Sequence, residues 1–270
     1  MSHVGSGLFF HMKRSTRLAF IIVCIFCCII SNAQKKYTVA NAHSHNDYLN
    51  EKPFQLAFEN GFGSIEADVF PVNGSLLVAH HKKDTQSQRS LKNLYIDPLL
   101  RSFDALGKRK LSLLVDIKED YELSLALLAK ELEPLKKYLS TPDQPNFISI
   151  VVSGARPSPA QYKNYPGYIF FDDDLKLPHN ANEWSRVALV SLPFNKISGW
   201  NGKNDLKRKD RKVLAHIIDS VHKAGKPIRF WAAPDTETSW KWQMKLGADL
   251  IGTDQINDLA NFLRKEQKEQ

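Results

Sequence analysis

Two histidines of this chain follow short apolar runs, which is where parallel strands present side chains at one end of a sheet. They are His45 and His80. A neutral imidazole that faces another across a cation suits general acid–base cleavage of a phosphodiester, because one takes a proton from the attacking hydroxyl and the other returns one to the leaving oxygen. We therefore predict that His45 and His80 are catalytic, in either order. For their neighbours His43 and His81 we predict structural hydrogen bonds.

Two carboxylates alternate with apolar residues in the run 63–70. Glu66 and Asp68 are two positions apart, so both side chains project from one face of a strand. Like charges packed together repel unless a positive group lies between them. With Asp116 and the side-chain oxygen of Asn46, the set offers only oxygen ligands, which suits Mg2+ or Ca2+. We predict a divalent cation at these four residues, the alternative being solvated carboxylates in a loop.

Two further residues at predicted strand ends are candidates for substrate contacts. Trp231 ends the run 227–231, and Asp172 follows the run 168–171. An aromatic ring beside a cleft can hold a cation or a sugar. We predict that Trp231 lines the pocket and that Asp172 contacts substrate, although the acidic run 172–174 is also compatible with a simple turn.

The elements that must position these residues follow a βα pattern. Short β-branched runs alternate with segments of helical periodicity, which is typical of a parallel sheet with helical crossovers. The predicted strands are 38–42, 63–70, 75–79, 111–117, 147–152, 168–171, 187–192, 227–231 and 249–252. Neither an internal repeat nor a linker rich in Pro, Gly or Ser divides them. We predict an α/β fold, a single (β/α)8 TIM-type barrel over residues 34–270 with the site at the carboxyl ends of its strands.

Two local signals refine this prediction. Asn73-Gly74 favours a tight turn that returns the chain into 75–79. Leucines repeat at intervals of three and four residues across 125–139, which predicts one long helix, kinked at Pro134.

Residues 1–33 are typical of a secretory signal peptide. A basic stretch precedes thirteen apolar residues, 18–30, and small residues follow at 31–33. A bilayer span takes about 20 apolar residues, which disfavours a permanent anchor. All three cysteines lie in this leader, so the mature chain offers no disulfide, thiolate zinc site or cysteine nucleophile. We predict an exported protein, periplasmic or secreted.

Composition indicates a globular protein, since 43% of the residues are apolar and 24% are charged. The formal charge is +8, and three of the basic residues lie in the leader, which leaves +5. This mild charge argues against nucleic-acid binding. The basic run 207–212 is either the solvated face of a helix or a transient contact with an anionic membrane surface. The oligomeric state stays open.

The spaced motifs are similar to those of the phosphatidylinositol-specific phospholipase C and glycerophosphodiester phosphodiesterase superfamily. They are His-Asn-Asp-Tyr at 45–48, Glu-x-Asp-Val at 66–69, Val-x-His at 78–80, Asp-Ile-Lys at 116–118, Trp231, and Gly-Ala-Asp-x-Ile-Gly-Thr-Asp at 247–254. The opening His-Ser-His-Asn-Asp-Tyr and Tyr-Ile-Asp-Pro-Leu at 95–99 resemble the branch of the fungal altered-inheritance-of-mitochondria protein. The resemblance extends from His43 to Asp254.

The resemblance implies a metal-dependent phosphoric diester hydrolase acting on a glycerophosphodiester or a phospholipid-type substrate. It assigns catalysis to His45 and His80, and the cation to Asn46, Glu66, Asp68 and Asp116. It also implies that Lys118 offsets phosphate charge. The chain departs from the glycerophosphodiesterases, which usually begin His-Arg-Gly, carry Glu-Asn-Thr and have Asp after the second histidine. Relatives commonly have Glu at the position of Asp116. These departures affect the expected substrate more than the expected chemistry.

Two alternatives stay open. His43-Ser44-His45 and Asp254 also fit an amidohydrolase-like barrel that holds zinc, although the later histidines His179, His216 and His222 are few for that site. A barrel that has lost catalysis and binds a lipid or glycan is the non-enzymatic alternative.

Overall fold

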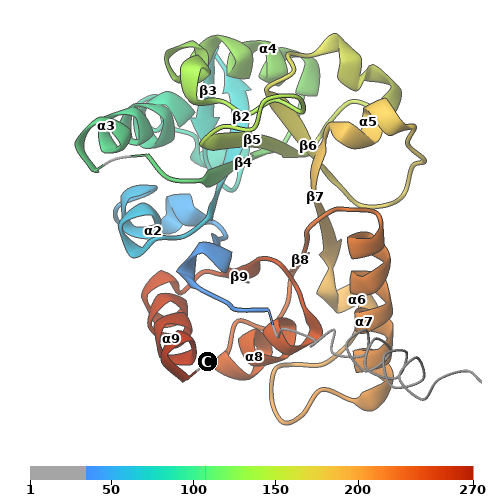
Figure 1. The fold of residues 1–270 in the computed structure, drawn as a ribbon. Helices are drawn as coiled ribbons and strands as arrows, with labels where there is room; N and C mark the ends of the chain where they lie inside the picture. The colour runs from blue at the N-terminus through green and yellow to red at the C-terminus, as the bar shows by residue number, and fades with distance from the viewer. Residues whose placement is uncertain (1–34, 107, 270) are drawn as a thin grey trace, which may run out of the picture. The chain divides into compact units, whose positions relative to one another are not determined.

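The computed structural model describes residues 35–106 and 108–269, and the predicted signal peptide lies outside them. Eight parallel strands of the described chain form one sheet in the order β8-β7-β6-β5-β4-β2-β1-β9. They are β1 (Ala42–Ser44), β2 (Ser64–Val72), β4 (Leu111–Ile117), β5 (Ile148–Gly154), β6 (Ile169–Asp173), β7 (Val187–Pro193), β8 (Ile228–Trp231) and β9 (Ile251–Thr253). A parallel bridge between Arg229 and Leu250 joins the two ends of this order. The predicted TIM-type barrel is thus confirmed (Figure 1).

Helices connect the strands on the outside of the barrel (Figure 1). They are α2 (Gln55–Asn60), α3 (Asp97–Leu106), α4 (Tyr121–Glu131), α5 (Ala181–Ser185), α6 (Phe194–Ile197), α7 (Arg208–Lys223), α8 (Glu237–Leu246) and α9 (Ile256–Glu269). None of the helices within the described ranges combines the length and the apolar character that a membrane span requires.

A ninth strand, β3 (Ser75–Val78), pairs antiparallel with β2 and is not part of the barrel. The Asn73-Gly74 turn is confirmed: both residues have positive φ, 49° and 79°, which a tight hairpin turn requires. Val69 pairs with Val78. This hairpin returns His80 to the carboxyl end of β2, the end we call the mouth of the barrel.

Two predicted elements were wrong in extent. The predicted strand 38–42 is replaced by the later β1. Residues Val39–Asn41 form a 3-10 turn, which Thr38 caps by accepting a hydrogen bond from the amide of Ala40. The predicted long helix ends at Glu131, and a separate 3-10 helix covers Glu133–Tyr138. Pro134 explains the break, since it has no amide hydrogen and its ring clashes with the preceding turn.

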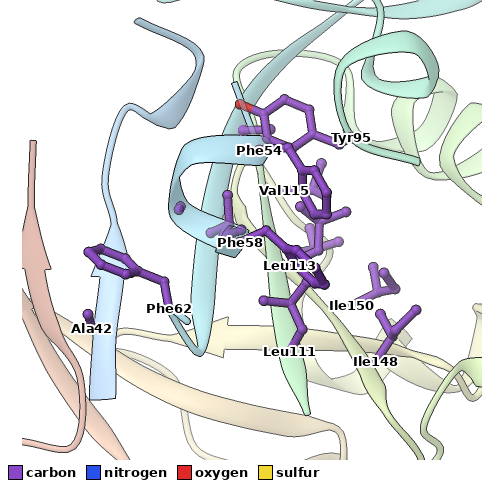
Figure 2. Packing of buried hydrophobic residues seen from close by; sticks show 14 of the residues in the cluster. Ala42, Phe54, Phe58, Phe62, Tyr95, Leu111, Leu113, Val115, Ile148 and Ile150 are labelled. Carbon is purple, nitrogen blue, oxygen red and sulfur yellow. The ribbon is translucent and has the colours of Figure 1, made fainter. Parts of the chain in front are cut away.

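The core lies between the strands and the helices. Ile65, Ala67 and Val69 of β2 are fully buried there. Figure 2 shows Phe54, Phe58 and Tyr95 beside the strand that carries Leu111, Leu113 and Val115. A second apolar cluster, Leu114, Val151, Phe170 and Leu189, comes from the alternate positions of four neighbouring strands and fills the inside of the barrel. Glu66 and Asp68 occupy the same inward-facing phase of β2, at the mouth.

Candidate active site

A cavity of about 460 Å³ opens at the mouth of the barrel. Six residues predicted from the sequence line it: His45, Glu66, Asp116, Lys118, Asp172 and Trp231. They come from strands or strand ends spread over the whole chain, as expected for the carboxyl-terminal face of such a barrel. The other predicted residues, Asn46, Asp68 and His80, join this group through hydrogen bonds.

His45 is held by a carboxylate from the other end of the chain. Its Nδ1 lies 2.8 Å from Oδ1 of Asp254, which follows β9. Asp254 is itself fixed, since its amide donates to Asp235. Burial alone lowers the pKa of His45, but the hydrogen bond to Asp254 and the charges of Glu66 and Asp254 outweigh it, so the pKa is raised. Asp254 therefore favours the imidazolium form of His45.

His80 is held through a tyrosine. The hydroxyl of Tyr48 lies 3.0 Å from Nδ1 of His80 and 2.7 Å from Oδ2 of Asp68. The same hydroxyl donates to Oδ1 of Asn46 at 2.8 Å in an alternative orientation. Burial, together with the charge of Asp68, raises the pKa of Tyr48, so the phenol stays protonated. Tyr48 thus links three predicted residues.

The two neighbouring histidines differ in role. His43 is fully buried, with Nδ1 2.8 Å from Oγ of Ser64, so its predicted structural hydrogen bond is confirmed. The prediction for His81 was wrong. Its ring makes no hydrogen bond with another residue of the described chain and lies edge-on to His80, 4.6 Å between ring centroids.

Glu66 pairs with an arginine that sequence reasoning missed. Nη1 of Arg229 lies 3.0 Å from Oε2 of Glu66, and Nε2 of His43 lies 2.7 Å from the same oxygen and also contacts Arg229. Burial opposes the charge on Glu66, but Arg229 and His43 outweigh it and hold the pKa of Glu66 below its usual range. Burial lowers the pKa of His43 to about 4, so this imidazole is neutral.

Asp68 and Asp116 converge on Lys118. Its Nζ lies 2.7 Å from Oδ2 of Asp68 and also pairs with Asp116. Asp116 further accepts from Oγ of Ser153, 2.7 Å away. A Cβ at Gly154 would lie 2.6 Å from Oδ1 of Asp116, so glycine is needed for this close approach. The charge that Lys118 offsets here is that of two carboxylates.

The structure agrees only in part with the predicted four-residue site for a hard cation. Oδ1 of Asp68 is buried without a hydrogen-bond partner among the described residues, which is a free oxygen ligand beside Asp116. Glu66, in contrast, already pairs with Arg229 and His43, and Oδ1 of Asn46 accepts a hydrogen bond from Tyr48. In residues 35–106 and 108–269, no three His, Cys, Asp or Glu side chains are grouped closely enough to hold a metal as they stand.

Asp172 lies on β6, lines the cavity and is buried. Burial raises its pKa to about 7, although Arg229, the hydroxyl of Ser191 and Arg156 lower it in part. Its Oδ1 has no hydrogen-bond partner among the described residues. A buried carboxyl group with a free oxygen at a cavity wall is suited to binding a substrate hydroxyl.

The raised pKa of Asp172 predicts a pH-dependent stability. The folded protein holds this proton up to about pH 7, the unfolded chain only to its ordinary pKa of 3.8, so stability falls as pH rises between these values. In the Asp172→Asn variant the side chain is an amide, which stays uncharged over this pH range. We expect the variant to gain about 3 kcal/mol over wild type in unfolding free energy between pH 5 and pH 8, measured by urea titration. Asp143→Asn, in an exposed loop, is the control; an equal gain in both variants would contradict the prediction.

Comparison with known proteins agrees with the motifs. Residues 31–108 match the family model described as an AIM6-like phosphodiesterase domain. The altered inheritance of mitochondria protein 6 homolog of Arthroderma benhamiae is 27% identical over 82% of this chain and 82% of that protein. Altered inheritance of mitochondria protein 6 of Eremothecium gossypii is 25% identical over 83% of this chain and 69% of its own length.

Solved structures share the fold. A calcium-dependent phosphoinositol-specific phospholipase C from a Pseudomonas species aligns with a TM-score of 0.54 at 13% identity, covering 84% of this chain and 93% of the other. A glycerophosphodiester phosphodiesterase from Parabacteroides distasonis aligns with a TM-score of 0.56 at 12% identity, covering 86% and 98%. The chain therefore shares the TIM-barrel fold of these two enzymes, and the resemblance of its sequence to the AIM6-like phosphodiesterase domain and to the altered-inheritance-of-mitochondria proteins is confirmed.

Proposed function

We propose that the protein is an exported, metal-assisted phosphoric diester hydrolase that cleaves a glycerophosphodiester or a phospholipid-type substrate. One observation carries this proposal: two histidines at the mouth are each anchored through Nδ1 and leave Nε2 available. His45 is anchored by Asp254, and His80 by the hydroxyl of Tyr48. Neither Nε2 is hydrogen-bonded to another residue of the described chain. This is the state that proton transfer to and from a substrate requires.

The residues around the histidines define their roles in this proposal. Asp254 stabilises the imidazolium that His45 becomes when it accepts a proton, as an acidic partner does for a general base. His45 therefore takes the proton from the attacking hydroxyl, and His80 returns one to the leaving oxygen. Lys118, Arg156 and Arg229 line the cavity and offset the charge of the phosphodiester.

A divalent cation, Mg2+ or Ca2+, belongs to the same proposal. The free oxygen of Asp68 and the carboxylate of Asp116 would hold it, with Glu66 and Asn46 as the other predicted ligands. Bound there, it would neutralise the phosphoryl oxygens. Lys118, which lies between the two aspartates in this structure, would then be free to turn toward the substrate.

The part of the cavity formed by β6, β7 and β8 would hold the substrate alcohol. Asp172 and Ser191 offer hydrogen-bonding groups, and Trp231 offers a ring that is 44% exposed. This lining suits a leaving group or headgroup that carries several hydroxyls. The zinc alternative finds less support, because His179, His216 and His222 do not line the cavity.

Phosphorus NMR tests the proposal directly. Residues 36–270 form one compact unit and would be incubated with glycerophosphodiesters, lysophospholipids and phosphoinositides, with chelator and with added Mg2+ or Ca2+. We expect a phosphomonoester or a cyclic phosphate to appear only with metal, and the product identifies the bond that is cut. Hydrolysis of amides or carboxylic esters with bound zinc, and of no phosphodiester, would overturn the proposal.

A further inference from the structure

Asp235, in the loop between β8 and α8, is a charged group that the proposed mechanism does not use. Its carboxylate accepts three hydrogen bonds, from Nε1 of Trp240 at 2.9 Å, from Oγ1 of Thr253 at 3.0 Å and from the amide of Asp254 at 2.9 Å. The tryptophan donates to Oδ1, and the other two donate to Oδ2. Asp235 thus ties this loop to the end of β9.

Both residues that donate to Oδ2 also hold His45. The carboxylate of Asp254 accepts from Nδ1 of His45 at 2.8 Å, and the carbonyl of Thr253 accepts from the amide of His45 at 3.0 Å. One of them therefore holds the imidazole ring and the other holds the backbone. Asp235 acts on His45 through both.

Asp254 depends on its backbone for its position. Its side chain is 57% exposed, and its hydrogen-bond partners in the described chain are His45 and Asn46, both at Oδ1. Packing therefore does not hold this carboxylate, and the amide hydrogen bond to Asp235 fixes the backbone from which it extends. Asp235 itself is half-buried, and with His45 and Asp254 it lines a small cavity of about 140 Å³.

The three hydrogen bonds require a carboxylate at this position. Each oxygen of Asp235 faces an N–H group, that of Trp240 or that of Asp254. A carboxylate only accepts hydrogen bonds, whereas the amide of asparagine has one accepting and one donating end. In either orientation, asparagine at position 235 would turn its amino group toward one of these N–H groups.

We propose that Asp235 is a positioning residue for His45. By holding Asp254 and Thr253, it keeps Nδ1 of His45 bound to a carboxylate and leaves Nε2 available to the substrate. The effect of Asp235 on the reaction rate rests on the phosphodiesterase function proposed above. Its effect on the proton of the imidazole does not, so the two can be tested separately.

Histidine ¹⁵N NMR tests the positioning without a substrate. A carboxylate partner places the proton of a neutral imidazole on Nδ1, so at pH 9 we expect the Nδ1 shift of a protonated nitrogen for His45. Asp235→Asn should move it toward the shift of an unprotonated nitrogen, as should Asp254→Asn. The signal that His45→Ala lacks gives the assignment. Asp258→Asn, an exposed carboxylate in the first turn of α9, is the matched control and should leave the shift unchanged.

Kinetics separates positioning from a merely structural role. Asp235→Asn is expected to lower kcat about 10-fold or more and to leave KM within about threefold, because a displaced proton acceptor affects the transition state rather than binding. In the His45→Ala background the same substitution should change kcat less than about twofold, because Asp235 acts through His45. Losses that multiply in the double variant would overturn the proposal.

Thr253→Val decides the question if Asp235→Asn does not fold. Valine keeps the shape of threonine and removes one of the three donors to Asp235, so the same change in the His45 shift is expected at smaller size. An unchanged shift in every variant that folds, as judged by circular dichroism, would contradict the proposal. If the wild type hydrolyses no phosphodiester, the proposed function fails, and the ¹⁵N shifts still show whether Asp235 holds His45.

Discussion

Replacing His45 with alanine is expected to lower kcat by about 10²–10⁴-fold. The reason is that the variant loses the imidazole that Asp254 holds in place, and one acid–base partner contributes an effect of this size. Because His45 moves a proton in the transition state, KM should change far less than kcat. Phosphorus NMR or a chromogenic phosphodiester gives the rates, with whichever substrate the wild type cleaves.

The control for this variant is His216→Ala. His216 is exposed on α7, distant in sequence from the mouth residues, and does not line the cavity. It should retain wild-type kcat. If kcat of His45→Ala were within threefold of the wild-type value, the catalytic role proposed for His45 would be wrong. The description of the barrel and its cavity would not be affected.

Replacing Arg229 with methionine is expected to cost about 3–5 kcal/mol of unfolding free energy. Methionine fills much of the volume, but it leaves the carboxylate of Glu66 buried without its cation, which is a penalty of this order. In the wild type His43 is neutral, because burial and the charge of Arg229 lower its pKa to about 4, so Arg229 supplies the positive charge beside Glu66. Urea unfolding at pH 7, followed by circular dichroism, gives the difference.

Two further variants make this prediction specific. Arg208→Met changes an exposed arginine and should stay within about 0.5 kcal/mol of wild type. Glu66→Gln combined with Arg229→Met removes the stranded charge and should recover part of the loss. If the double variant were as unstable as the sum of the two single variants, the pairing of Arg229 with Glu66 would not explain the cost.

The strands and the residues at their ends could be predicted because both follow local rules. Alternation of apolar residues with Glu66 and Asp68 identified β2 and its inward face, and the continuous apolar run 111–117 identified β4. In a parallel barrel all strand ends meet at one face, so their polar residues come together without any further information. The leucine pattern across 125–139 misled, because the helix ends before Pro134 and does not continue through it with a kink.

The partners of these residues could not be predicted because they come from distant parts of the chain. Asp254 lies 209 positions from His45, and Arg229 lies 163 positions from Glu66. Arg229 had one local signal: a single charged residue in the buried strand Ile228–Trp231 needs a buried counter-charge. The predicted metal ligands were chosen from strand spacing, oxygen chemistry and the family resemblance, none of which shows that the cations Lys118 and Arg229 already lie beside these carboxylates.

The hairpin that carries His80 places the two proposed proton-transfer groups in different parts of the fold. His45 is fixed to the barrel itself, whereas His80 follows β3, a strand outside the barrel order. Leu76 and Val78 of the hairpin are fully buried, but the stretch 80–88 after β3 is mostly exposed, so exchanging that stretch would alter the half of the proposed chemistry that His80 supplies while the buried residues of β3 stay in place. Such modularity makes this segment the natural target for directed evolution of new leaving-group preferences.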